Sequence, residues 1–141
     1  MSAICQKSRH HFHCALHLDN SANTKRTALA SLAENFDIFQ FAGPVLNLAR
    51  LFVHKLQCDQ NLGWDTKLRM PQLSEWRRIA NQVNSSQPII IDRFVGSRNG
   101  EYKLIAFRDA SKVMTGVVIY IQDINTKKVS FLIAKNRLVN N

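Results

Sequence analysis

The chain has 141 residues and a formal charge of +9, from 19 Lys and Arg against 10 Asp and Glu. No window approaches about 18 consecutive apolar residues, and histidines and charges interrupt residues 1–19 where a signal peptide needs an apolar centre, so we expect neither a membrane nor a secreted protein but an intracellular one, cytoplasmic or nuclear. This basic balance favours a nucleic acid as the acidic partner. The 3 cysteines, an odd number at irregular spacing, indicate reduced thiols rather than disulfides.

Residues 1–23 are polar and His-rich, and they lack sustained periodicity, so we expect a poorly ordered lead-in. Four histidines and Cys14 cluster between residues 10 and 17, which suggests a zinc site. Zinc needs four ligands that converge tetrahedrally, usually from two short-spaced pairs separated by a loop. In this segment the potential ligands are grouped at one place, and Cys5 is the only plausible ligand at a distance from them. We therefore favour a solvated cluster over a zinc site.

Three segments with helical periodicity follow, and together they predict a helical region over residues 24–87. Residues 24–36 begin with a capping threonine, and residues 44–56 begin with a proline and form the clearest helix of the chain. Residues 71–83 also begin with a proline. We expect the first helix to bury Leu29, Leu32, Ala33 and Phe36, and the two tryptophans to be core anchors, Trp64 and Trp76.

The C-terminal part of the chain has the composition of strands. Residues 88–94 predict one strand, and a polar connection follows. Residues 104–111, 116–122 and 129–134 are rich in β-branched and aromatic residues, and each segment has the length of a strand. Residues typical of turns separate them. We therefore predict an antiparallel meander of three strands, and the fold class is α+β.

Asp109 is the candidate functional carboxylate, because it stands at the end of the first strand of this meander. A carboxylate in that place can hold a divalent metal where a phosphate backbone docks, as in nucleases that use paired metal ions. Alone it cannot form a site. Without further features, a structural Asp109 beside Ser111 is the more common outcome.

Seven separated segments resemble, in one order, the polyproteins of Bel/Pao-type retrotransposons at the point where reverse transcriptase passes into ribonuclease H. These segments are TKRTALASLAENFD (24–37), GPVLNLARLFVHKL (43–56), LGWD (62–65), LSEWRRI (73–79), IIIDRF (89–94), LIAFRDAS (104–111) and FLIAKNRLV (131–139). The resemblance covers residue 24 to the C-terminus, and seven ordered blocks are far more specific than one motif.

The resemblance implies a domain organisation and a chemistry. Residues 24–87 would be the helical connection region, and residues 88–141 would be the N-terminal part of a ribonuclease H-like domain, with an incomplete three-strand meander. Asp109 would correspond to the first metal-binding carboxylate of that fold. The intact parent would bind RNA/DNA hybrid and hydrolyse the RNA strand with Mg²⁺.

The chain also departs from the family's pattern. After Asp37 it lacks the Pro and Gly of the family's DPLG turn, and Arg108 stands where family members usually carry a small or sulfur-bearing residue. The chain stops at Asn141, before the helices and strands that supply the remaining carboxylates of the fold. We therefore expect a truncated fragment that is inactive alone and does not bind Mg²⁺ tightly.

The expected residual activity is weak, salt-dependent binding of RNA/DNA hybrid. The candidate contacts are Arg50, Lys55, Arg77, Arg78, Lys135 and Arg137. Other expected partners are the rest of the polyprotein and further copies of the chain, which would associate through an unpaired strand edge at residues 129–134.

Two alternative functions stay open. One is a structural or interaction remnant without catalytic activity. The other is an aspartic peptidase-type segment, in which Asp is followed by Thr or Ser and then Gly, so that two subunits bring two carboxylates close enough to share a proton. Asp109 is followed by Ala110 and Ser111 instead, so we favour nuclease ancestry.

Overall fold

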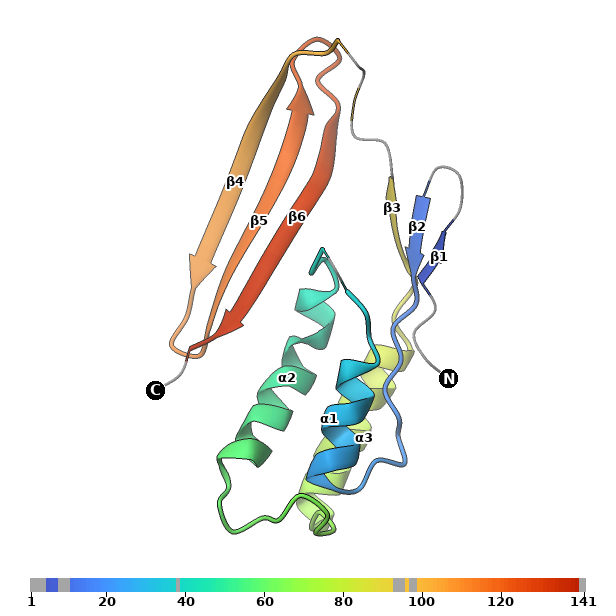
Figure 1. Cartoon of the computed structure of the whole chain (residues 1–141), viewed down its shortest axis with the longest axis vertical. Coiled ribbons are helices and arrows are strands. Elements are labelled where there is room, and N and C mark those ends of the chain that lie inside the picture. Colours follow the sequence, from blue (N-terminus) through green and yellow to red (C-terminus); the bar gives the residue numbers. More distant parts are fainter. Residues whose placement is uncertain (1–4, 8–10, 38, 93–95, 97–98, 140–141) are drawn as a thin grey trace. The chain divides into compact units, whose positions relative to one another are not determined.

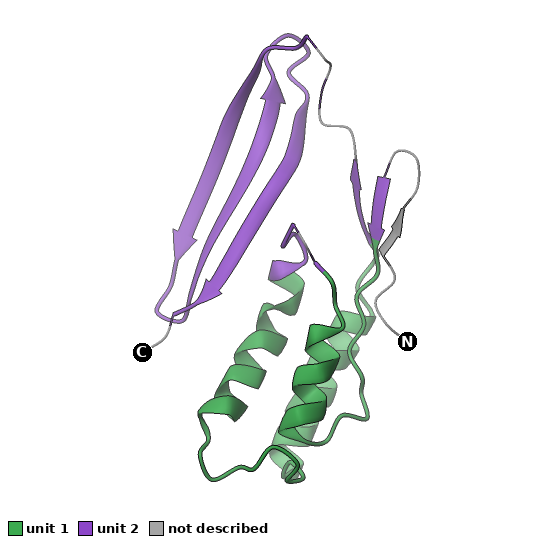
Figure 2. Ribbon diagram, viewed as in Figure 1, with its two compact units in different colours: residues 1–5, 14–36, 44–88 green, residues 6–13, 37–43, 89–141 purple. Residues whose placement is uncertain are grey.

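A computed structural model of the chain describes residues 5–7, 11–37, 39–92, 96 and 99–139. Within these residues it has three helices and two three-stranded sheets, which confirms the α+β class (Figure 1). The chain forms two compact units, each built from separate stretches of sequence (Figure 2). Unit 1 comprises Met1–Cys5, Cys14–Phe36 and Pro44–Pro88, and unit 2 comprises Gln6–His13, Asp37–Gly43 and Ile89–Asn141.

Unit 1 contains helices α1 (Lys25–Ala33), α2 (Gly43–Cys58) and α3 (Met70–Asn84). Trp76 of α3 is fully buried, its ring lies 5.6 Å from that of Phe52, and its Nε1–H donates to the Asp19 carbonyl at 2.8 Å. The prediction that Trp76 anchors the core is confirmed. Among the described residues, no helix is both long enough and apolar enough to cross a lipid bilayer.

Helix α1 has the predicted N-cap but buries another face. The Thr24 hydroxyl accepts the Thr27 N–H, as expected of a cap. The buried side chains of this helix are Lys25, Ala28 and Ser31, and the helix ends before Phe36, which is 66% exposed. The predicted apolar stripe is therefore wrong.

Polar contacts explain which face of α1 is buried. The Ser31 hydroxyl accepts the Asp19 N–H at 2.7 Å, and the Asn35 amide exchanges hydrogen bonds with the backbone of His17 at 2.9 and 2.7 Å. These side chains satisfy backbone groups of the extended segment that follows β2. Trp64 also differs from the prediction, since it is 46% exposed, with the Lys25 ammonium 5.5 Å from its ring centroid.

The described residues of the predicted lead-in include two strands. Strands β1 (Cys5–Lys7) and β2 (His11–Cys14) form a sheet with β3 (Ile89–Asp92), in the order β1-β2-β3. Beyond β2, Leu18 is fully buried, and its N–H and C=O both bond to the Asn84 amide, at 2.8 and 2.9 Å. Residues 93 and 94, the end of the strand predicted over 88–94, lie outside the described residues.

The predicted three-strand meander is confirmed in unit 2. Strands β4 (Tyr102–Ala110), β5 (Met114–Asp123) and β6 (Val129–Leu138) pair antiparallel in sequence order. The β5–β6 turn is held by Asp123, whose carboxylate accepts the N–H groups of Thr126 and Asn125 at 2.9 Å. These bonds, that of Thr126 above all, hold the pKa of Asp123 below its usual value.

One face of this meander is covered by a row of aromatic rings. The row runs from Phe107 through Tyr120 and Phe131 to Phe41 and Phe39, with successive ring centroids 6.1, 6.0, 5.9 and 6.4 Å apart. Phe39 and Phe41 come from the segment between α1 and α2. That segment thus packs on the sheet through the edge-to-face contact of Phe41 with Phe131.

The same segment also occupies part of the outer edge of β6. The Ala134 N–H donates to the Phe39 carbonyl at 2.8 Å, and the Asn136 N–H donates to Gln40 Oε1 at 2.9 Å. Gln40 adopts a positive φ of 53°, which turns the chain alongside the strand. The predicted unpaired edge over residues 129–134 is therefore occupied at Ala134.

We expect Trp76→Ala to lower the free energy of unfolding of the helical unit by about 3 to 5 kcal/mol, because it leaves a cavity and removes the bond to Asp19. The matched control is W64A, which should cost only about 1 kcal/mol because Trp64 is half-exposed. Urea denaturation followed by helical circular dichroism measures both. Equal losses in the two variants would contradict the assignment of Trp76 as the anchor.

Candidate nucleic-acid interface

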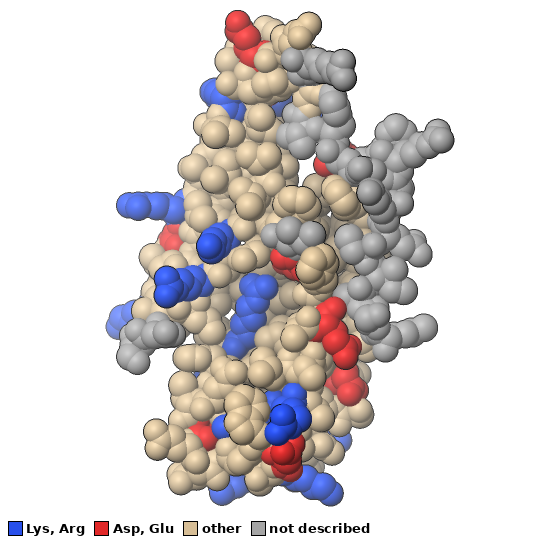
Figure 3. Space-filling view, viewed as in Figure 1, with Lys and Arg blue, Asp and Glu red and all other residues tan. Residues whose placement is uncertain are grey.

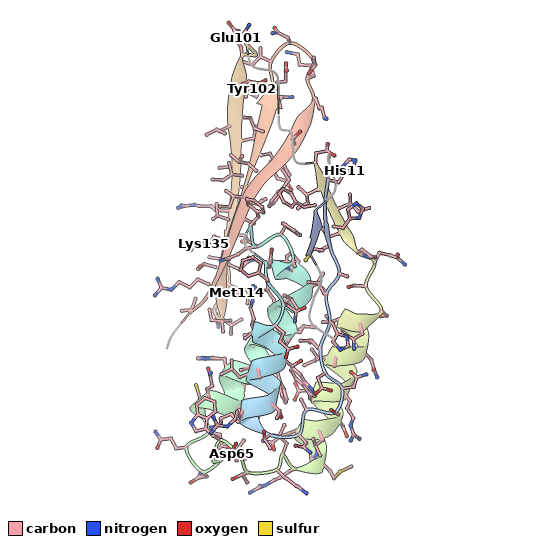
Figure 4. All side chains as sticks on the ribbon, turned by 45° about the vertical axis from the view of Figure 1, so that its right-hand side comes forward. His11, Asp65, Glu101, Tyr102, Met114 and Lys135 are labelled. Atoms are coloured by element: carbon pink, nitrogen blue, oxygen red, sulfur yellow. The ribbon has the colours of Figure 1, made fainter. Side chains whose placement is uncertain are left out.

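A hollow lies on the β4-β5-β6 sheet. It has a volume of about 640 Å³, and all three strands contribute to its lining. The lining residues are Arg108, Asp109 and Ala110 from β4, Thr115, Gly116 and Val117 from β5, and Lys135 and Arg137 from β6. We call this the basic hollow. Figure 4 labels Lys135 in the lower half of the sheet, towards the end at which Met114 begins β5.

The strand register places three cations on one face. Arg108, Val117 and Lys135 are aligned across the three strands, and Arg137 stands two rows along, opposite Thr115. Aligned residues in an antiparallel sheet project to the same face, and residues two apart on one strand share it too. Arg108, Lys135 and Arg137 therefore share one face of the sheet, and all three are exposed.

No carboxylate neutralises this group among the residues that the structure describes. None of the ion pairs of the described part of the chain involves the three cations of the hollow, and one of them joins Arg26 to Asp65 at 2.7 Å in unit 1. There the hydrogen bond lowers the pKa of Asp65 and raises that of Arg26. Figure 3 shows Lys and Arg side chains gathered over the lower part of the sheet. The basic hollow thus presents uncompensated positive charge.

Asp109 lies in the adjacent cross-strand row, opposite Gly116, which is opposite Asn136. Because side chains alternate along a strand, this row projects to the face opposite that of the three cations. Asp109 is exposed, and its Oδ1 accepts the N–H of the next residue, Ala110, at 2.8 Å. Asp109 therefore borders the basic hollow through its backbone, while its carboxylate accepts the Ala110 N–H.

The described residues around Asp109 do not fit a divalent metal site. No three His, Cys, Asp or Glu side chains come together anywhere in the described ranges of the chain. Asp109 is opposite Gly116, which is opposite Asn136, so this cross-strand row contains a single carboxylate. A hard divalent cation takes about six oxygen ligands. We derive no metal-dependent step from this chain.

The histidine cluster of the lead-in is used in other contacts. His11 Nδ1 lies 3.0 Å from Asp92 Oδ1 of β3, and the rings of His11 and His13 meet edge to face at 6.3 Å. Cys14 is buried, and His10 lies outside the described residues. The observed pairing is consistent with a structural role for His11 in the small sheet.

The six cations predicted to contact nucleic acid are divided between the two units. Arg50 and Lys55 lie on α2, and Arg77 and Arg78 lie on α3, all in unit 1. The structure brings only two of the six together in the basic hollow, Lys135 and Arg137. The third cation of the hollow, Arg108, was missed. The alternation of side chains along β4, combined with the pairing of Arg108 with Val117 on β5, was the signal that could have identified it.

A family model described as Pao retrotransposon-like RNaseH-like domain matches residues 24–140. The chain belongs to this family. No curated protein and no solved structure matches the chain. The match confirms the resemblance to a Pao-type retrotransposon polyprotein, and it spans the helices as well as the meander. The Pao RNaseH-like domain therefore includes α1 to α3, whereas β1 and β2 precede the matched residues.

We expect Mg²⁺ to bind Asp109 of the Pao RNaseH-like domain only weakly, because a single carboxylate leaves most of the coordination shell to water. The amide signals of Asp109 and Ala110, followed by nuclear magnetic resonance, should shift without saturation up to about 10 mM Mg²⁺. A saturable shift that Asp109→Asn abolishes would contradict this expectation.

Proposed function

We propose that this Pao RNaseH-like domain binds the phosphate backbone of a nucleic acid, RNA/DNA hybrid in the parent element, through the basic hollow. The observation that carries the proposal is the alignment of Arg108, Lys135 and Arg137 on one exposed sheet face, where none of them forms an ion pair with a carboxylate of the described residues. The family to which the chain belongs is compatible with such a partner.

The geometry of the sheet suits a polyanion. Neighbouring strands lie about 4.8 Å apart, so Arg108 and Lys135, two strands apart, start about 10 Å from each other. Lys135 and Arg137, two residues apart on β6, start about 7 Å from each other. These long side chains can reach successive phosphates, and the Thr115 hydroxyl between them can donate to a phosphate oxygen.

Such contacts carry no base specificity by themselves. Phosphate contacts fix position and orientation, whereas sequence is recognised through base edges. The described residues of the hollow offer guanidinium, ammonium and hydroxyl donors on a flat sheet, with no aromatic ring to stack on a base. We therefore assign the hollow to backbone binding with strong salt dependence.

We expect replacement of the three cations of the hollow by glutamine (R108Q, K135Q and R137Q together) to weaken binding of a labelled RNA/DNA hybrid. The slope of log Kobs against log salt concentration is negative, and its magnitude should decrease by about 2 to 3. Each lost phosphate contact lowers that magnitude by about 0.9. Fluorescence anisotropy titrations at several salt concentrations measure both quantities.

The matched control is Lys55→Gln, Arg77→Gln and Arg78→Gln together, which removes the same charge from exposed positions of α2 and α3. It should lower the slope by less than about 1, because only the general field of the protein changes. Equal effects of the two triple variants would refute the hollow as the binding site. Affinity that does not depend on salt would refute a phosphate-driven contact.

We expect no cleavage of the hybrid by the purified 141-residue chain in Mg²⁺, because the described residues supply one carboxylate to a reaction that uses a cluster of them. A gel assay with labelled RNA strand tests this. Cleavage by the wild type that D109N abolishes would overturn the inference, whereas cleavage that survives in D109N would indicate a contaminating nuclease.

A further inference from the structure

The segment that follows β2 is extended, and it lies beside helices α1 and α3 of unit 1 (Figures 1 and 4). Its alternate side chains Cys14, Leu16 and Leu18 are buried, at 2, 9 and 0% exposure, whereas the residues between them are exposed. This is the alternation of a strand with one buried face. We call residues 14–19 the docked segment.

Two asparagine side chains bond to the backbone of the docked segment in the way that a neighbouring strand would. The Asn35 amide exchanges two hydrogen bonds with His17, at 2.9 and 2.7 Å. The Asn84 amide exchanges two with Leu18, at 2.8 and 2.9 Å. Each amide thus satisfies both the N–H and the C=O of one residue. Such contacts recognise a backbone and not a particular side chain.

A hydroxyl and an indole satisfy the next residue of the segment. The Ser31 hydroxyl accepts the Asp19 N–H at 2.7 Å, and the Trp76 Nε1–H donates to the Asp19 carbonyl at 2.8 Å. Three successive residues therefore have all their backbone polar groups bonded to side chains of the helical unit. We call these side chains the backbone clamp, and they are Ser31, Asn35, Trp76 and Asn84.

The backbone clamp is built for an occupied state. Ser31, Asn35 and Trp76 are at most 9% exposed, and buried polar groups that lose their partners destabilise a fold. An extended backbone in the site is therefore favoured over an empty site. All four clamp side chains lie within residues 24–140, which match the family, whereas the docked segment precedes them. Site and occupant are thus separate stretches of the chain.

We propose that the backbone clamp is a peptide-binding site for an extended segment with apolar side chains at three alternate positions, and that a second copy of the chain supplies this segment when a copy's own segment has left. The site lies in unit 1 and is independent of the basic hollow. Backbone bonding leaves the exposed positions free to vary. The apolar positions set the register, because a shift by one residue would bury His17 in place of Leu18.

A synthetic peptide tests the site in the full chain. Leu18→Asp places a charge at a fully buried position and should expel the chain's own segment, while the clamp side chains stay intact. A labelled peptide of residues 12–21, with Cys14→Ala to prevent oxidation, should then bind. Its affinity for L18D should exceed that for the wild type at least about tenfold, because the wild-type site is already occupied. Fluorescence anisotropy measures both affinities.

Two modified peptides separate backbone from side-chain recognition at a single residue. N-methylation of His17 removes the N–H that Asn35 accepts and should weaken binding about tenfold or more. His17→Ala should change binding less than about twofold, because that side chain is exposed. If L18D lowers the helical circular dichroism, the unmodified peptide should restore it and the N-methylated peptide should not. Equal affinities for L18D and wild type, absence of both binding and restoration, or equal effects of the two modifications would overturn the proposal.

A mixture of two damaged chains tests the supply of the segment by a second copy. L18D retains the clamp but lacks the ligand, whereas Asn35→Ala with Asn84→Ala retains the ligand but lacks most of the clamp. Each alone should sediment as a monomer, and their equimolar mixture at about 50 μM should contain a dimer. The control mixes L18D with the triple variant L18D, N35A and N84A, which offers no ligand. A monomeric mixture would refute exchange between copies, and a dimer in the control would refute the clamp as its site.

Discussion

The row of aromatic rings on the β4-β5-β6 sheet is the contact on which unit 2 depends. Every fully buried apolar side chain among the described residues belongs to unit 1, except Ala42. A three-strand sheet needs a hydrophobic face or a packed helix to be stable on its own. Phe39 and Phe41 supply that layer for one face, and the Phe39 carbonyl continues the hydrogen bonding of β6. This explains why Asp37–Gly43 belongs to the unit of the strands rather than to that of the flanking helices.

The aromatic row also decides which surfaces remain for binding. Tyr120 is aligned with Ile105 and with Phe131, and Phe107 is two residues from both Ile105 and Asp109 on β4. The three rings therefore lie on the same sheet face as Asp109. The three cations of the basic hollow project from the opposite face. The Asp109 carboxylate and the three cations therefore project from opposite faces of the sheet, although Asp109 also borders the hollow.

The parts of the fold that local pattern determines were predictable from the sequence. Alternating β-branched and aromatic residues gave the meander, and the prolines at the starts of α2 and α3 gave those helices. The lead-in was missed because β2 pairs with a strand more than 70 residues away, and no local period records that. The face of α1 was missed because Ser31 and Asn35 satisfy distant backbone groups, so polar residues are buried there.

The candidate site follows the same division. Lys135 and Arg137 were predictable because both stand on one strand of a recognisable segment. Arg108 required the register, which aligns it with Lys135 through Val117. The loss of the DPLG turn after Asp37 was expected only to remove turn residues. The residues that stand there instead include Phe39 and Phe41. Their rings pack on a sheet that begins some 70 residues later in the chain, so the sequence around Asp37 does not indicate this contact.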